Sequence, residues 1–173
     1  MPRRPELRPV TDDDREFLFR LYASTRQDEL SVVPWSDEQK ESFLRSQFDA
    51  QTRSWGVDFP DACFNVIEVG GERAGRLYVQ QREEELRIVD IALLPEYRGQ
   101  GIGRVLLEQI LAQARESGRA VRIHVEKNNP AYRLYLRLGF RMSMDKGVYD
   151  LLEWRPGADS RSFSPTTNEP GTI

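Results

Sequence analysis

Residues 97–107, YRGQGIGRVLL, place three glycines at alternate positions directly before a run of aliphatic residues. Gly99, Gly101 and Gly103 thus lie between an extended segment and a segment with helical periodicity. Glycine loses more backbone freedom on folding than any other residue, so such a cluster indicates close backbone approach or positive φ angles. A helix start offers unpaired N–H groups and a partial positive charge. The pattern therefore predicts an anion-binding loop at the start of a helix.

Hydrophobic periodicity divides the rest of the chain into strands and helices. Strands are predicted over 6–11, 62–69, 72–81, 85–95, 120–127, 140–144 and 147–154, and helices over 11–25, 35–55, 101–118 and 129–139. Gly70 and Gly71 join two strands as a hairpin, and Ser36 and Gln39 form a capping-box pattern, whereas residues 26–35 are expected to be irregular. The order of segments predicts a mixed α/β (α+β) domain with a central sheet and helices on its faces.

Composition limits the class of protein. The 173 residues are 39% hydrophobic and 31% charged, a soluble balance, and a single domain is predicted over 1–155 with a flexible polar tail over 156–173. A net charge of −3 argues against a nucleic-acid partner, and no run is apolar enough to span a membrane, so a cytoplasmic location is expected. With one cysteine and one histidine no metal site is expected, and Cys63 is expected to be a buried thiol.

Two nucleotide-binding motifs can be compared with the glycine-rich loop. A Rossmann turn requires G-x-G-x-x-G directly after a strand. Gly99 and Gly101 satisfy its start, but Arg104 occupies the place of the last glycine, and four residues separate the strand from Gly99. Glu126 could serve as the acid that binds the ribose, so this alternative, with NAD(P)H as the ligand, stays open. The G-x-x-x-x-G-K-[ST] string of a P-loop does not occur.

The segment IALLPEYRGQGIGRVLL resembles the acetyl-CoA motif of the GNAT superfamily of N-acetyltransferases, R/Q-x-x-G-x-G/A, with Arg98, Gly101 and Gly103 at the fixed positions. The downstream segment NNPAYRLYLRLGF resembles the N-x-x-A-x-x-L-Y-x-x-x-G-F motif of the same superfamily. Its matching residues are Asn128, Ala131, Leu134, Tyr135, Gly139 and Phe140. The resemblance covers about residues 86–141. It implies a mostly antiparallel mixed sheet that is splayed between its fourth and fifth strands, with helices on both faces.

The resemblance also implies how acetyl-CoA, the cosubstrate, is bound. The pantetheine arm would dock as a pseudo-strand beside the backbone of Ile91, Ala92 and Leu93, and the Leu93 N–H would polarise the thioester carbonyl. Asn128 would contact the same arm or cap the final helix. The pyrophosphate would be held by the N–H groups of Gly99, Gln100, Gly101, Ile102, Gly103 and Arg104. Arg98 and Tyr135 are the further residues expected to contact the cosubstrate.

Transfer to an amine requires protonation of the departing thiolate and deprotonation of the amine. The resemblance implies Tyr135 as the acid, because a phenol with a pKa of about 10 keeps its proton at neutral pH. A core aromatic is the alternative interpretation. The base stays open: Asp90 is the tentative candidate, although a structural ion pair with an arginine such as Arg87 or Arg122 would explain it equally. His124, Glu126 and a water relay are the further alternatives.

The acceptor site implied by the resemblance lies between the first two helices and the last hairpin. Tyr22, Arg26, Trp35 and Tyr149 are its tentative residues, with Asp28 and Glu29 nearby. Acids and aromatic rings together suit a cationic amine, although an exposed loop would explain Asp28 and Glu29 equally. The resemblance implies that the acceptor is a small-molecule or peptide amine that attacks directly in a ternary complex. The protein is expected to be a monomer or a homodimer. A catalytically silent acyl-CoA-binding regulatory module is the alternative function.

Overall fold

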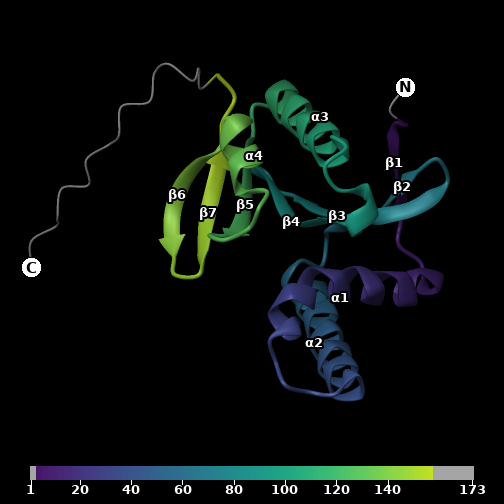
Figure 1. Ribbon diagram of the computed structural model, residues 1–173. Coiled ribbons are helices and arrows are strands. Elements are labelled where there is room, and N and C mark those ends of the chain that lie inside the picture. Colours follow the sequence, from purple (N-terminus) through teal and green to yellow (C-terminus); the bar gives the residue numbers. More distant parts are fainter. Residues whose placement is uncertain (1–2, 158–173) are drawn as a thin grey trace, which may run out of the picture.

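The computed structural model describes residues 3–157 (Figure 1). The strands are β1 (Pro5–Pro9), β2 (Cys63–Val69), β3 (Glu72–Gln81), β4 (Glu85–Leu93), β5 (Ala120–Glu126), β6 (Arg141–Lys146) and β7 (Tyr149–Trp154). The helices are α1 (Arg15–Ser31), α2 (Asp37–Asp58), α3 (Ile102–Ser117) and α4 (Tyr132–Arg137), with 3₁₀ turns η1 (Asp12–Asp14) and η2 (Pro95–Tyr97). The tail predicted over 156–173 lies almost wholly outside the described residues. None of the described helices is long and apolar enough to cross a membrane.

The strands form one sheet in the order β1-β2-β3-β4-β5-β7-β6. Among the described strands only β4 and β5 pair in parallel, and the other neighbours are antiparallel. The predicted mixed, mostly antiparallel sheet is therefore confirmed. The Rossmann alternative is wrong, because that fold is built on an open sheet of mostly parallel strands.

The two parallel strands separate at the centre of the sheet. Residues Glu85–Ile88 of β4 pair with Ala120–Ile123 of β5. Beyond these residues β4 continues to Leu93 and β5 to Glu126, but the two strands no longer pair with each other. The predicted splay between the fourth and fifth strands is confirmed. Backbone N–H and C=O groups on the facing edges are left free to bind an extended ligand.

A β-bulge changes the direction of the side chains within β4. Tyr78 of β3 lies opposite Asp90, whereas Val79 lies opposite Ile88, so Val89 is the extra residue. Ile88 and Ile91 consequently both pack toward α3. Strict alternation would have put Asp90 on the same face as Ile88. The bulge turns it to the opposite face.

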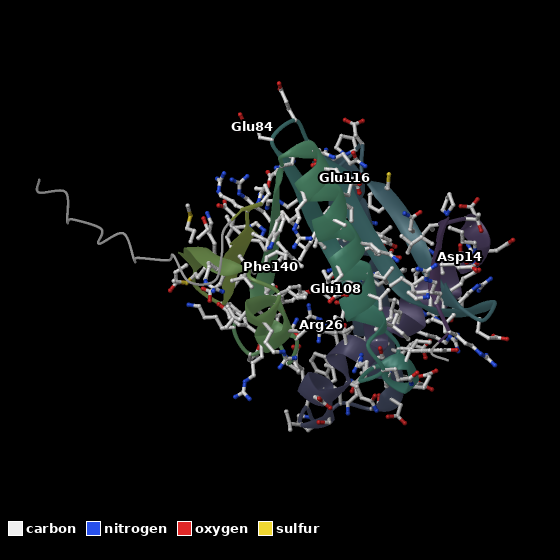
Figure 2. All side chains as sticks on the ribbon, turned by 90° about the horizontal axis from the view of Figure 1, so that it is seen from above. Asp14, Arg26, Glu84, Glu108, Glu116 and Phe140 are labelled. Atoms are coloured by element: carbon white, nitrogen blue, oxygen red, sulfur yellow. The ribbon has the colours of Figure 1, made fainter. Side chains whose placement is uncertain are left out.

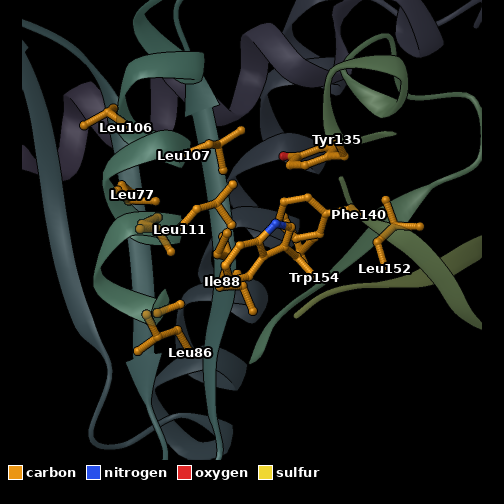
Figure 3. Close-up of a cluster of buried hydrophobic side chains, with 14 of the residues drawn as sticks. Leu77, Leu86, Ile88, Leu106, Leu107, Leu111, Tyr135, Phe140, Leu152 and Trp154 are labelled. Atoms are coloured by element: carbon orange, nitrogen blue, oxygen red, sulfur yellow. The ribbon is translucent and has the colours of Figure 1, made fainter. Parts of the chain in front are cut away.

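Helices cover both faces of the sheet, as predicted (Figure 1). On one face α3 and α4 enclose an apolar core. Figure 3 shows part of it, with Leu77, Leu86, Ile88, Leu106, Leu107, Leu111, Tyr135, Phe140, Leu152 and Trp154. On the other face α1 and α2 contribute Phe17, Leu18, Phe19, Leu21, Tyr22 and Phe48 to a second core. Ala92 and Leu94 at the end of β4 pack against this second core.

Three local predictions are wrong. Residues 26–31 are helical rather than irregular, since α1 runs to Ser31 and the first helix-breaking residue after it is Pro34. Helix α4 is shorter than predicted, because the Asn129 side chain accepts the Ala131 N–H at 2.8 Å in a turn that precedes the helix. Cys63 is exposed, since it lies at the very start of β2. The capping box of Ser36 and Gln39 is confirmed at the start of α2.

Candidate active site

The glycine-rich loop leaves its N–H groups unpaired. Gly99 and Gly101 have φ angles of +72° and +81°, and Gly101 is the N-cap of α3. Among the described residues, none of the N–H groups of Gly99–Arg104 has a protein acceptor, and the first backbone bond runs from the Val105 N–H to the Gly101 oxygen. No atom lies within 4 Å of where a Cβ at Gly99 or Gly101 would stand. The loop is thus an open cradle of N–H donors that fits an anion.

The side chains of the loop point away from this cradle. Arg98 Nε donates to the Leu93 carbonyl oxygen at 2.9 Å, so this arginine holds the loop against the end of β4. The Gln100 amide donates to the Glu96 carbonyl oxygen, and Arg104 pairs with Glu108 one turn along α3. In this arrangement the backbone, rather than an arginine side chain, presents positive charge to an anion.

The predicted pantetheine strand borders the gap between β4 and β5. Ile91 and Leu93 direct their side chains toward α3 and Ala92 toward α1 and α2. Because the Leu94 N–H bonds to Ala74 of β3 and strand residues alternate, the backbone groups of Ile91 and Leu93 face the gap, whereas those of Ala92 face β3. Asn128 is exposed and lines a hollow of about 580 Å³ beside α4. The N-cap of α4 is Ala131, which has no side-chain cap, and the side chain that bonds the backbone just before the helix is that of Asn129 rather than Asn128.

Tyr135 is buried at the base of the gap. Its side chain is 3% exposed, and its ring packs edge-on against Phe140 with centroids 5.5 Å apart. Figure 3 shows its hydroxyl directed away from α4 toward Leu107. Burial, and then the charge of Asp90, raise the pKa of Tyr135 well above its ordinary value. The phenol therefore stays protonated at neutral pH, as a proton donor must.

Asp90 is held by an arginine that the sequence did not indicate. Arg76 Nε donates to Asp90 Oδ2 at 2.6 Å, and the guanidinium lies 4.8 Å from the ring centroid of Trp55 and 5.5 Å from that of Tyr78. Arg76 is 4% exposed, whereas the Asp90 side chain is 28% exposed. Neither arginine suggested from the sequence pairs with Asp90, because Arg87 and Arg122 both pair with Glu85.

The two other candidate bases lie on β5. His124 Nδ1 lies 3.2 Å from an Arg87 nitrogen, and partial burial and this arginine lower the pKa of His124. Glu126 lies beyond the last residue that pairs with β4, and its carboxylate accepts the Tyr149 hydroxyl at 3.3 Å. Glu126 therefore borders the gap from β5.

Three of the four predicted acceptor residues converge. Arg26 lies over the Tyr22 ring and 3.8 Å from the Glu126 carboxylate, which also binds Tyr149. Trp35 joins them indirectly, because its ring packs edge-on against Phe43 at 5.3 Å. Phe43 borders a hollow of about 200 Å³ between α1 and α2. Its other lining residues are Tyr22, Arg26, Glu29, Leu30 and Gln47.

Sequence reasoning missed three residues of this hollow, Phe43, Gln47 and Leu30, the last because residues 26–35 were expected to be irregular. Phe43 lies on one apolar helical face with Leu44 and Phe48, a pattern that is typical of core residues. It is in fact 41% exposed. No sequence signal marks Gln47, because a glutamine on a helix is usually a solvated surface residue.

A splayed mixed sheet with an N–H cradle at one helix start and a buried phenol beside the gap defines the class of acyl-CoA-dependent N-acetyltransferases. The sequence profile of the acetyltransferase (GNAT) family matches residues 17–140, and the chain belongs to this family.

Individual relatives agree with this assignment. Streptothricin acetyltransferase of Streptomyces lavendulae is 34% identical over 107 residues, which are 58% of this chain and 56% of that protein. The [ribosomal protein bS18]-alanine N-acetyltransferase of Haemophilus influenzae is 36% identical over 127 residues, covering 70% of this chain and 73% of the relative. The crystal structure of PaiA N-acetyltransferase from Thermoplasma acidophilum in complex with coenzyme A has a TM-score of 0.66 at 19% identity, over 87% of this chain and 98% of the other.

Proposed function

We propose that the protein transfers the acetyl group of acetyl-CoA to a primary amine of a small-molecule or peptide acceptor, by direct attack in a ternary complex. The proposal rests on one observation, that three features lie together at the gap between β4 and β5. The cradle of Gly99–Arg104 N–H groups lies at its end, the unpaired edge of β4 forms its side, and Tyr135 lies at its base.

Acetyl-CoA fits this arrangement and would supply the thioester and its thiolate leaving group. The N–H groups of Gly99–Arg104 would hold the pyrophosphate, while Ile91–Leu93 would pair with the pantetheine amides. Asn128, exposed at the start of the α4 segment, is the proposed side-chain contact to the same arm. The N–H of Leu93 would polarise the thioester carbonyl as charge develops on its oxygen.

The amine nitrogen attacks the carbonyl carbon, so a C–N bond forms, the C–S bond breaks, and the amine must lose a proton. Tyr135 would donate its proton to the departing sulfur, since the phenol holds its proton at neutral pH and lies beside the gap. Asp90 is the proposed base, since the bulge turns it away from α3 and the bond with Arg76 uses only Oδ2. His124 suits this role less well, because Arg87 lies against its ring nitrogen.

The names of the relatives indicate two kinds of acceptor. One is named for streptothricin and the other for an alanine of a ribosomal protein, so small-molecule and peptide amines both belong in the test. Tyr22, Arg26, Trp35 and Tyr149 are the proposed acceptor contacts.

A thiol-release screen with acetyl-CoA tests the proposal. We expect amine-dependent release of free coenzyme A thiol with at least one class among diamines, amino acids and short peptides with free N-termini. We also expect acetyl-CoA, but not NADH, to raise the melting temperature. A protein that acetyl-CoA stabilises, but that releases no thiol with any amine, would instead be a silent acyl-CoA-binding module.

A further inference from the structure

Arg26 places a positive charge between two carboxylates beside the acceptor hollow. Its Nη1 lies 3.1 Å from Glu29 Oε1 and 3.8 Å from Glu126 Oε1, and its guanidinium carbon lies 5.7 Å from the centroid of the Tyr22 ring. Figure 2 shows Arg26 where the helices of the first half of the chain approach the segment of β5 and α4. Glu126 also accepts the Tyr149 hydroxyl.

These surroundings have the chemistry of a cation site. Carboxylates form charge-assisted hydrogen bonds with ammonium groups, and an aromatic face attracts a cation through its quadrupole. The adjoining hollow of about 200 Å³ adds Phe43 and the Gln47 amide. It has room for an alkyl-ammonium group next to Glu29.

The contacts of Arg26 are weak enough to be exchanged. Its side chain is 30% exposed, that of Glu126 29% and that of Glu29 59%, and partly exposed ion pairs contribute little to stability because water and salt screen them. Arg26 meets the second core at the Tyr22 ring, and we expect the fold to persist without the guanidinium.

We infer that Arg26 stands in for a second positive charge of the acceptor, and that the preferred acceptor is a diamine. This inference rests on the proposed function. One amine would be acetylated at the gap, while the second, as an ammonium, would displace the Arg26 guanidinium from Glu29 and Glu126. A monoamine has no second ammonium group that could take the place of the Arg26 guanidinium. Arg26 thus competes with the second ammonium group of the substrate for Glu29 and Glu126.

Alkylamines matched in length test this inference. Diamines with three to eight carbons are compared with the corresponding monoamines in the thiol-release assay. For the best diamine we expect kcat/KM to exceed that of its monoamine by at least tenfold. In Arg26→Gln the KM for this diamine should fall roughly three- to tenfold, the scale of a partly exposed ion pair, and the preference in kcat/KM for the diamine over its monoamine should rise by a similar factor. Arg20→Gln, which removes the same charge from an exposed position on α1, is the matched control and should change neither.

Glu29→Gln and Glu126→Gln should each raise the KM for the diamine. Isothermal titration of the diamine against wild type and Arg26→Gln gives a readout without turnover, with tighter binding expected in the variant. Equal kcat/KM for diamine and monoamine, activity on peptides but on no alkylamine, or weaker diamine binding in Arg26→Gln would each overturn the inference. Failure of the proposed function would differ, because then no amine of any class releases thiol.

Discussion

The donor half and the acceptor half of the active site are built in different ways. On the proposed donor side, backbone groups of residues 91–93 and 99–104 would do the binding, and a continuous apolar core under α3 holds them. On the proposed acceptor side, side chains from α1, α2, β5 and β7 would form the site, and charged pairs join them. A site that binds through backbone N–H groups needs glycines and a fixed backbone geometry. The specificity of a site that binds through side chains can change when one side chain is substituted. We therefore expect mutations on the two sides to separate donor binding from acceptor choice.

The largest effect is expected at Tyr135, where the two halves meet. Tyr135→Phe keeps the ring but removes the proton donor, so turnover should fall ~10²–10⁴-fold while acetyl-CoA affinity holds within a few-fold. No hydrogen bond of this hydroxyl is found within residues 3–157, so the melting temperature should change little. Tyr132→Phe is the matched control, because its hydroxyl binds Asp150 and lies on the same helix. If Tyr135→Phe retains full turnover, Tyr135 is not the acid.

Gly101→Asp should abolish donor binding. The change puts a negative side chain into the N–H cradle at a φ of +81°, so the acetyl-CoA affinity should fall by ~10²-fold or more and the thermal shift with acetyl-CoA should vanish. Gly118→Asp introduces the same side chain at a φ of +68° at the other end of α3 and should keep the thermal shift. An intact shift in a folded Gly101→Asp protein would remove the loop from the donor site.

Asp14 should make the attachment of α1 sensitive to acid. It is fully buried and pairs with Arg8 and Arg73, and the hydrogen bonds from Arg8 hold its pKa well below the ordinary value (Figure 2). The folded state favours the ionised carboxylate of Asp14. Its contribution to the free energy of unfolding is therefore fully present above about pH 4, and it is lost as the pH falls through the lower pKa that Asp14 has in the folded state.

Asp14→Asn should cost about 2 kcal/mol of unfolding free energy at pH 7 and a smaller amount at pH 3, as measured by urea denaturation. The same loss at both pH values would show that Asp14 stabilises through packing rather than charge.

The smallest effect is expected at the rim of the acceptor side. Trp35→Ala removes the ring that packs on Phe43, so the KM for the acceptor should rise roughly threefold while the KM for acetyl-CoA stays unchanged. Val32→Ala, in the same connection but 84% exposed, is the control and should have no effect. A change in the KM for acetyl-CoA would show that the two halves are coupled.

The sequence by itself determined the features that depend on a few neighbouring residues. The glycine loop, the Ser36 capping box, the Gly70-Gly71 hairpin and the motif with Tyr135 were all readable, because positive φ angles and helix starts are set by local sterics and local hydrogen bonds. These features were enough to predict the splayed sheet and the family.

Only the tertiary structure decided where the charged side chains meet. The bulge at Val89 depends on how β4 pairs with β3, and it alone turns Asp90 from the α3 face to Arg76. The meeting of Arg26 with Glu126 joins residues one hundred positions apart and needs the longer course of α1. Such contacts are set by strand register and helix packing, which no short stretch of sequence encodes, because their free energy comes from segments that meet only after folding.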